Sequence, residues 1–248
     1  MKVIAVWNFK GGSGKTTTSI NLAYNLSSMY RVLVLDLDPQ RNTVSYLSKE
    51  LNQGKTIYEV IVGDKELSKV TYRSKYKNID FVYGSRKLPY KDLDVTLLAT
   101  ELGKMRIQDK YDYVIIDCGP AETDITYLAL NSADILLTPI NLDQYCRDNL
   151  ITVHQILNDV KANFNNYLSW HVFINEYAPK SKTQQMVLEE LQESFDYPIM
   201  DSAISYSRIV QNSASALKPL MKHRSKNTAT LDYIDLTEEL IGIGKGES

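Results

Sequence analysis

The sequence predicts an α/β fold, a single domain in which a mostly parallel, doubly wound sheet carries helices on both faces. Short apolar runs alternate with segments of helical periodicity, one run is continuously apolar, and a glycine-rich loop joins the first run to the first helical segment. Strands that alternate with helices are typical of a parallel sheet, and a continuously apolar strand is typical of one buried on both faces. A chain of 248 residues is long enough to bury one sizeable core.

The predicted elements follow one another along the chain. The first strand covers 3–7, and a helix over 16–29 follows the loop, with apolar residues at helical spacing. Further strands are predicted over 31–36, 113–117, 134–140 and 170–175, and further helices over 149–162 and 183–195. In 64–94, where charged and aromatic residues mix, we expect a peripheral helix and a strand over 79–83. Four acidic residues among apolar ones predict an acidic amphipathic helix over about 229–241.

The composition excludes several classes of protein. Lys plus Arg number 28 and Asp plus Glu 30, a net charge of −2, so bulk charge alone does not hold the protein on nucleic acid and any polyanion site must be a local patch. The two cysteines, Cys118 and Cys146, form no CxxC pair and no Cys/His cluster, so a zinc or disulfide scaffold is not expected. No apolar run fits a signal peptide or reaches the roughly 20 residues of a membrane span, which predicts a cytoplasmic protein.

The loop after the first strand has the chemistry of a phosphate cradle. Its residues are Lys10, Gly11, Gly12, Ser13, Gly14, Lys15, Thr16 and Thr17, and it opens directly into the helix. Glycines let backbone N–H groups surround phosphate oxygens, and the helix N-terminus adds a favourable dipole. We expect Lys15 to reach the β- and γ-phosphates and Thr16 to ligate Mg²⁺. The sequence therefore predicts a P-loop NTPase that binds a nucleotide with magnesium.

Polar residues follow three of the predicted strands. Asp36 and Asp38 end the second strand, Asp117 ends the third and Asn175 ends the fifth. Ligands of open α/β sheets collect at the carboxyl ends of the strands. Carboxylates there can hold a magnesium shell or orient an attacking water, and a side-chain amide can recognise a base. We expect these four side chains to share one site.

Residues 10–17 resemble the deviant Walker A motif, KGGxGKTT, of the ParA/MinD/Soj superfamily of dimeric ATPases. The resemblance implies that Lys10 reaches across an ATP-bound homodimer to the partner's nucleotide, and that Lys10 and Lys15 are catalytic. Residues 36–40 match the superfamily's DxDPQ motif, which implies that Asp38 positions the hydrolytic water and that Asp36 lies near the metal.

Two further positions carry the resemblance. Asp117 resembles the Walker B aspartate that binds Mg²⁺, although Gly119 stands where the superfamily commonly has the first proline of Cys-Pro-Pro. Asn175 resembles the asparagine that several MinD-like members place against adenine. The resemblance as a whole implies ATP and Mg²⁺ as ligands and slow hydrolysis by the unstimulated protein.

Three biological roles compete. A ParA-type partition ATPase binds DNA non-specifically as an ATP dimer and is released when a ParB-like centromere-binding partner stimulates hydrolysis. A MinD-like ATPase positions a protein cargo on a membrane or other surface. In a metabolic or kinase-like member, ATP drives transfer to a substrate. Residues 38–43 are similar to the DPQGN segment of the ParA branch, and the terminal helix lacks the bases that anionic lipid attracts. These features favour the ParA-type role, with association with the nucleoid in the ATP state.

Non-specific DNA binding needs clustered Lys and Arg. The candidate residues are Arg208, Lys218, Lys222, Arg224 and Lys226, and 64–94 contains a rival cluster of Arg73, Lys75, Lys77, Arg86 and Lys87. An ATP-bound dimer would present two small patches to the same DNA molecule, so that DNA binding depends on nucleotide. Too few residues precede Val3 for a helix-turn-helix domain, and we therefore do not expect sequence-specific operator binding.

Overall fold

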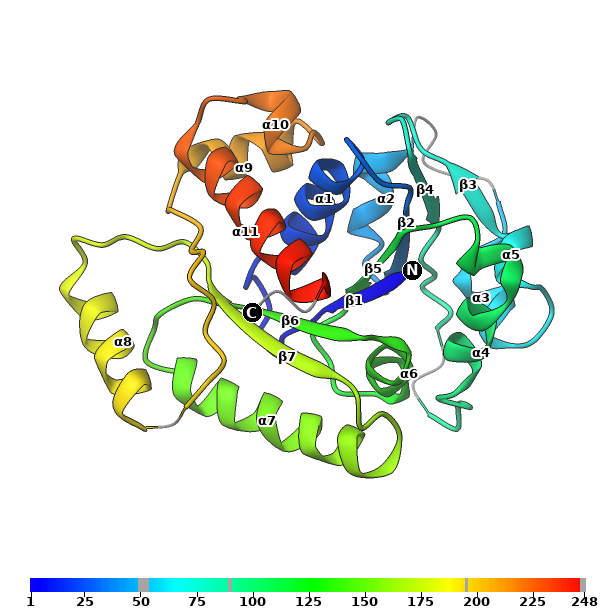
Figure 1. The fold of residues 1–248 in the computed structure, drawn as a ribbon, viewed down its shortest axis with the longest axis horizontal. Coiled ribbons are helices and arrows are strands. Elements are labelled where there is room, and N and C mark those ends of the chain that lie inside the picture. The colour runs from blue at the N-terminus through cyan, green and yellow to red at the C-terminus, as the bar shows by residue number, and fades with distance from the viewer. Residues whose placement is uncertain (49–53, 89–90, 195, 246–248) are drawn as a thin grey trace.

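A single seven-stranded sheet organises the chain (Figure 1). The computed structural model describes residues 1–48, 54–88, 91–194 and 196–245. The strands are β1 (Lys2–Val6), β2 (Val32–Leu37), β3 (Thr71–Arg73), β4 (Ile79–Val82), β5 (Tyr113–Cys118), β6 (Ile135–Ile140) and β7 (Ser169–Ile174). They lie in the order β3-β4-β2-β5-β1-β6-β7, and among the described residues every neighbouring pair is parallel except β3 with β4.

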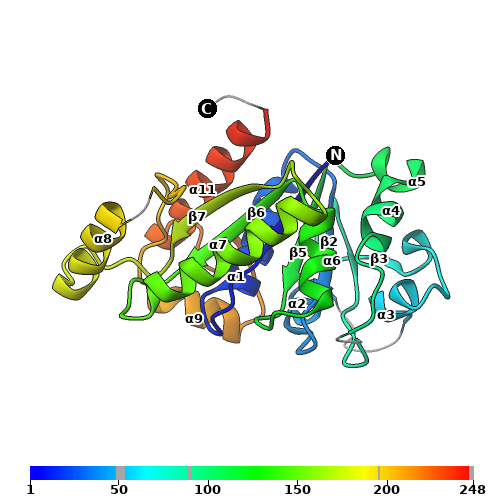
Figure 2. The same ribbon diagram turned by 90° about the horizontal axis from the view of Figure 1, so that it is seen from below.

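Helices cover both faces of this sheet. They are α1 (Lys15–Leu26), α2 (Asn42–Leu47), α3 (Ile57–Ile61), α4 (Leu97–Gly103), α5 (Met105–Gln108), α6 (Asp124–Ser132), α7 (Cys146–Asn163), α8 (Lys182–Ser194), α9 (Arg208–Ser215), α10 (Leu220–His223) and α11 (Thr228–Lys245). The face that carries α1 also carries α2, α9, α10 and α11, whereas α6 and α7 lie on the other side (Figures 1 and 2). The structure thus confirms the predicted α/β class.

The core is divided by the sheet into two layers. Successive side chains of a strand point to opposite faces, and in β1 Val3 and Ala5 join the cluster formed with α4, α6 and α7, while Ile4 and Val6 join the cluster formed with α1 and α11. All four of these side chains are buried. This two-sided burial is the reason that the central strands are apolar without alternation.

The structure confirms the six predicted strands and corrects one helix. The peripheral helix expected in 64–94 is wrong, because residues 67–69 form a single 3₁₀ turn and β3 follows at once. β3 pairs antiparallel with β4, and the Tyr72 ring packs against Phe81 and Tyr83 at centroid separations of 6.2 and 5.0 Å. Aromatic contacts of this kind stabilise strand pairs, which explains why a short charged segment becomes an edge strand. The predicted end of α8 at residue 195 lies outside the described residues.

The terminal helix α11 is longer than predicted and packs against α1. The Tyr233 hydroxyl lies 3.2 Å from that of Thr18, and the Asn25 amide donates to the Tyr233 carbonyl at 3.0 Å. Leu236 and Leu240 are buried beside them. The apolar face of α11 is therefore occupied by the protein's own core. Within the described ranges, no helix has the length and apolarity needed to cross a membrane.

Candidate nucleotide site

The glycine-rich loop lies between β1 and α1, as the sequence predicted. Gly12 and Gly14 have φ angles of +75° and +96°, a left-handed backbone that favours glycine. Gly14 is the N-cap of α1 and its carbonyl accepts the N–H of Thr18 at 2.8 Å. Gly11 and Gly12 are exposed, whereas Ser13 is buried and its hydroxyl has no partner among the described residues. The loop thus exposes backbone at the start of a helix, where an anion is stabilised.

The two lysines of the loop have different partners. Lys15 is buried, and its ammonium donates to the Lys10 carbonyl at 2.8 Å. Burial lowers the pKa of Lys15, and the nearby Asp117 carboxylate partly offsets this. The Lys10 ammonium instead donates to the Asp143 carboxylate, and both side chains are about one-third exposed. Sequence reasoning missed Asp143, although its position shortly after the buried strand β6 was a usable signal.

Asp36 and Asp117 are register partners on the adjacent strands β2 and β5, and both are fully buried. Asp117 accepts hydrogen bonds from the hydroxyls of Thr16 at 2.8 Å, Ser19 at 2.9 Å and Thr43 at 2.5 Å. Sequence reasoning missed two of these partners: Ser19 lies outside the motifs, and Thr43 ends the segment 38–43 without having been given a role.

Burial and a neighbouring carboxylate make each of these two aspartates harder to ionise. Burial raises the pKa of Asp36 well above its ordinary value, and the Asp117 carboxylate raises it further. Burial also raises the pKa of Asp117, while the hydrogen-bonded hydroxyls act in the opposite direction. Asp36 Oδ1 accepts the N–H of Asp38 at 3.1 Å, but Oδ2 is buried without a partner among the described residues. A cation at this point would offset the repulsion and occupy the unpaired oxygen.

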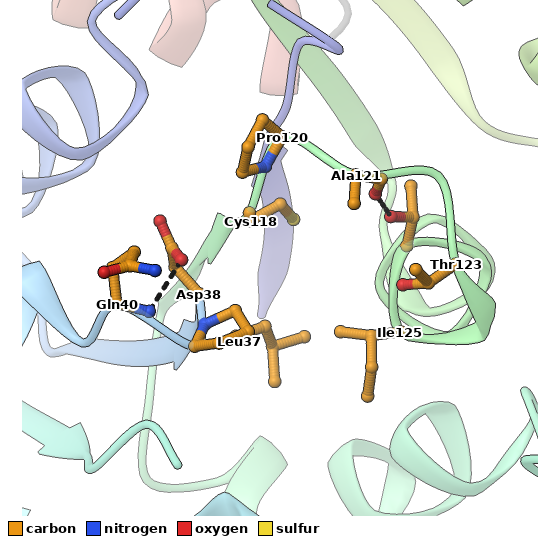
Figure 3. Close-up of a pocket in the computed structure, with 11 residues that line it drawn as sticks. Leu37, Asp38, Gln40, Cys118, Pro120, Ala121, Thr123 and Ile125 are labelled. Atoms are coloured by element: carbon orange, nitrogen blue, oxygen red, sulfur yellow. Dashed lines mark hydrogen bonds between the residues drawn. The ribbon is translucent and has the colours of Figure 1, made fainter. Parts of the chain in front are cut away.

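Asp38 borders a cavity of about 180 Å³ at the ends of β2 and β5 (Figure 3). Its Oδ1 accepts the N–H of Gln40 at 2.9 Å, which fixes the carboxylate within the turn. Leu37, Cys118 and Ile125 give the cavity mostly apolar walls. The Cys118 thiol is buried and burial raises its pKa, which agrees with a packing role rather than a nucleophile. The cavity is large enough for several water molecules beside Asp38.

Asn175 lies directly after β7 and contacts the loop. Its Nδ2 donates to the Ser13 carbonyl at 2.9 Å, and a Cβ atom added to Gly14 would lie 2.5 Å from the same nitrogen. In this structure the Asn175 amide therefore braces the loop, and its contact with adenine stays a prediction. The structure brings together every predicted loop residue, the three aspartates and Asn175 at one edge of the sheet.

Four of the five predicted DNA-binding residues lie near one another. Lys222, Arg224 and Lys226 line a recess of about 550 Å³ between α9 and the start of α11. Arg208 begins α9, and the preceding Ser207 places its hydroxyl 3.2 Å from the Asn227 side chain of this recess. The side chains of Arg208, Lys222, Arg224 and Lys226 form no ion pair with any described residue. Lys218 does not line this recess.

The comparisons with known proteins agree with this geometry. Residues 1–170 match the AAA domain family AAA_31. The chain is 28% identical to the chromosome partitioning protein ParA of Myxococcus xanthus, over 97% of this chain and 88% of that protein. It is 27% identical to the sporulation initiation inhibitor protein Soj of Bacillus subtilis, over 98% and 99% of the two chains.

A solved structure shares the whole fold. Apo McdA from Cyanothece superposes with a TM-score of 0.87 at 23% identity, over 97% of this chain and 99% of that one. A variant of McdA has been solved in complex with ATP. The family match, the strand–loop–helix at residues 10–17 and the acidic strand ends agree with one another. The chain belongs to the AAA_31 family of AAA domains, within the ParA/MinD superfamily.

Proposed function

We propose that the chain is an ATPase that binds Mg-ATP at the loop of residues 10–17. The backbone of Gly12 and Gly14 and the ammonium of Lys15 would hold the phosphates. The Thr16 hydroxyl, Asp36 and Asp117 would hold magnesium, whose charge would stabilise the transferred phosphoryl group. The buried, unpaired Asp36 Oδ2 and Ser13 Oγ support this assignment, because a buried polar atom without a partner is costly.

Asp38 and Lys10 would have different catalytic roles, one within the chain and one across the dimer. Asp38 would orient the attacking water from the adjoining cavity. Lys10 would reach the nucleotide of a second copy in an ATP-bound homodimer, which requires that it first leave Asp143. That ion pair is partly exposed and is worth about 1 kcal/mol or less, so closing the dimer would readily replace it.

The biological role that the structure supports best is that of a ParA-type partition ATPase. The observation that carries this proposal is the basic recess lined by Lys222, Arg224 and Lys226, whose cations form no ion pair among the described residues. Free cations in a recess suit the phosphates of DNA without sequence preference. The chain as a whole has a net charge of −2, so its affinity for DNA would come from the recesses. The ATP-bound dimer would present two of them to the same DNA, which would make DNA binding depend on nucleotide. A ParB-like partner would stimulate hydrolysis and release the DNA.

The alternative is a MinD-like ATPase that positions a protein cargo on a membrane or other surface. A lipid-binding α11 would need a free apolar face and basic flanks. The apolar face of α11 instead packs on α1 through Tyr233 and Leu236, and the exposed side carries Asp235 and Glu238. This packing favours DNA over lipid as the surface.

The test is co-sedimentation with non-specific duplex DNA, at low and moderate salt, with no nucleotide, with ADP, and with ATP plus Mg²⁺. We expect DNA binding only with Mg-ATP, weakening as salt rises. Lys15→Ala should abolish nucleotide binding, Lys10→Ala should bind ATP without forming the dimer, and Asp38→Ala should stay on DNA because hydrolysis stops. Normal hydrolysis by Asp38→Ala would overturn its assigned role. An ATP dimer that binds no DNA at any salt would overturn the partition role and make anionic liposomes or a protein cargo the next surface to test.

A further inference from the structure

Two basic segments that are far apart in the sequence flank the same face of α1. The Asn21 side chain of α1 accepts the N–H of Leu220 at 2.8 Å, two residues after Lys218. One helical turn further along, the Tyr24 ring packs edge-to-face on Tyr76 at a centroid separation of 5.2 Å. Residues three apart on a helix lie on one face. The segments that begin at Lys218 and at Lys75 are therefore neighbours across α1.

The electrostatics agree with this placement. Burial lowers the pKa of Lys75, and the Lys218 charge lowers it further. The Lys75 ammonium lies 5.5 Å from the centre of the Tyr76 ring, and no described acidic side chain forms an ion pair with either lysine. Two like charges held close together repel each other, and an anion between them would remove that cost.

A second basic recess, of about 480 Å³, continues from Lys75 along the starts of β2 and β4. Arg31 and Lys110 also line it, but they are paired with Asp112 and Asp80. The remaining cations of its lining are Arg73, Lys75 and Lys77, and none of these three has an acidic partner among the described residues. Because the recess lies where the strands begin, it is at the opposite end of the sheet from the nucleotide loop. The phosphates of the nucleotide cannot account for its charge.

We propose that Lys75 and Lys218 join the two recesses into one band that binds the phosphate backbone of DNA. The inference rests on the proposed DNA-binding function and extends it to the β3–β4 edge, which sequence reasoning treated as a rival patch. The band runs from Arg208 and the recess of Lys222, Arg224 and Lys226, past Lys218, to Lys75 and its neighbours. Unpaired cations spread over three segments suit a polymer with regularly spaced charges better than a single phosphate ion.

The test measures ATP-dependent binding to a fluorescent non-specific duplex as a function of salt. The double variant Lys75→Gln/Lys218→Gln should reduce the slope of log K against log salt by about 0.9 for each phosphate that is no longer neutralised, or about 1.8 in total. Lys180→Gln/Lys182→Gln removes the same charge from exposed residues at the start of α8 and should leave the slope unchanged. Lys75→Arg/Lys218→Arg retains both charges and should bind as the wild type does.

Each outcome decides between the inference and the function on which it rests. If the wild type binds DNA with ATP and the glutamine double variant shows the same slope, the extended band is wrong and the proposed function stands. If the wild type binds no DNA, both fail. If polyglutamate displaces the duplex as effectively as unlabelled DNA does, the surface is one for acidic proteins and the inference is overturned. ATP binding and thermal melting of each variant establish that it is folded.

Discussion

Gly14→Ala tests the contact between the phosphate loop and β7. Gly14 has a φ angle of +96°, and a Cβ atom there would lie 2.5 Å from Nδ2 of Asn175. That nitrogen donates the hydrogen bond that holds the Ser13 carbonyl. An alanine at this position must therefore adopt a left-handed backbone and also push the Asn175 amide away from its acceptor. The matched control is Gly12→Ala, because Gly12 also has a positive φ angle but no atom within 4 Å of its added Cβ.

The expected loss of unfolding free energy follows from the left-handed backbone of the alanine and from the hydrogen bond that the displaced Asn175 amide no longer makes. A left-handed alanine costs about 1–2 kcal/mol, and this is the whole cost expected for Gly12→Ala. Leaving the Ser13 carbonyl unpaired costs about 1–3 kcal/mol, so Gly14→Ala should lower the free energy of unfolding by roughly 2–5 kcal/mol. Asn175→Ala removes the same hydrogen bond. In the double variant Gly14→Ala/Asn175→Ala that bond is removed only once, so the two effects should fall short of additivity by about 1–3 kcal/mol.

Urea unfolding of the wild type, the three single variants and two double variants measures this coupling. We expect Gly14→Ala and Asn175→Ala to be coupled, and Gly12→Ala and Asn175→Ala to be additive within about 0.5 kcal/mol. Additivity of Gly14→Ala with Asn175→Ala would refute the reasoning, since it would mean that the added methyl group does not displace the Asn175 amide.

Three further predictions concern other parts of the fold. Asp143→Asn should raise the association constant of the ATP-bound dimer, measured by sedimentation velocity, by up to about 30-fold, because Lys10 in each of the two chains is freed from an ion pair worth about 1 kcal/mol or less. An unchanged association constant would mean that the pair does not compete with dimerisation. Burial lowers the pKa of His171, although Glu239 acts against this, so the unfolded chain takes up the proton first and stability falls as pH drops below about 6.5. His171→Asn should lose less stability than the wild type between pH 7.5 and 5.5 in urea unfolding, and an equal loss would contradict the assignment. Thr56→Ala should lower the free energy of unfolding by about 1 kcal/mol, since Thr56 accepts the N–H of Tyr58 at 3.2 Å and caps α3; no change would show that the cap contributes nothing.

The central sheet and the nucleotide edge could be predicted from the sequence because both are encoded locally. Buried parallel strands are continuously apolar, so the runs before Asp36 and Asp117 located the strands and their carboxyl ends. Parallel strands end at a shared edge, which predicts that the two carboxylates lie together. The structure makes them register partners.

Contacts that depend on tertiary packing could not be predicted in this way. β3 is three residues long and owes its pairing to aromatic packing around Tyr72. Hydroxyls are too common in sequence for Ser19 and Thr43 to be marked as partners of Asp117. Lys75 and Lys218 are separated by most of the chain and are brought together only by the packing of their segments on α1.

The measurement that tests the central proposal most directly is sedimentation velocity of the protein with a short labelled duplex, in Mg-ATP and in Mg-ADP. A nucleotide bound at Lys15 should switch the chain from a monomer to a dimer that carries DNA. The predicted result is a complex of two chains with the duplex in ATP, free DNA in ADP, and no complex in either nucleotide for Lys15→Ala. A complex of the same mass in both nucleotides, or an ATP dimer that leaves the duplex free, would contradict it.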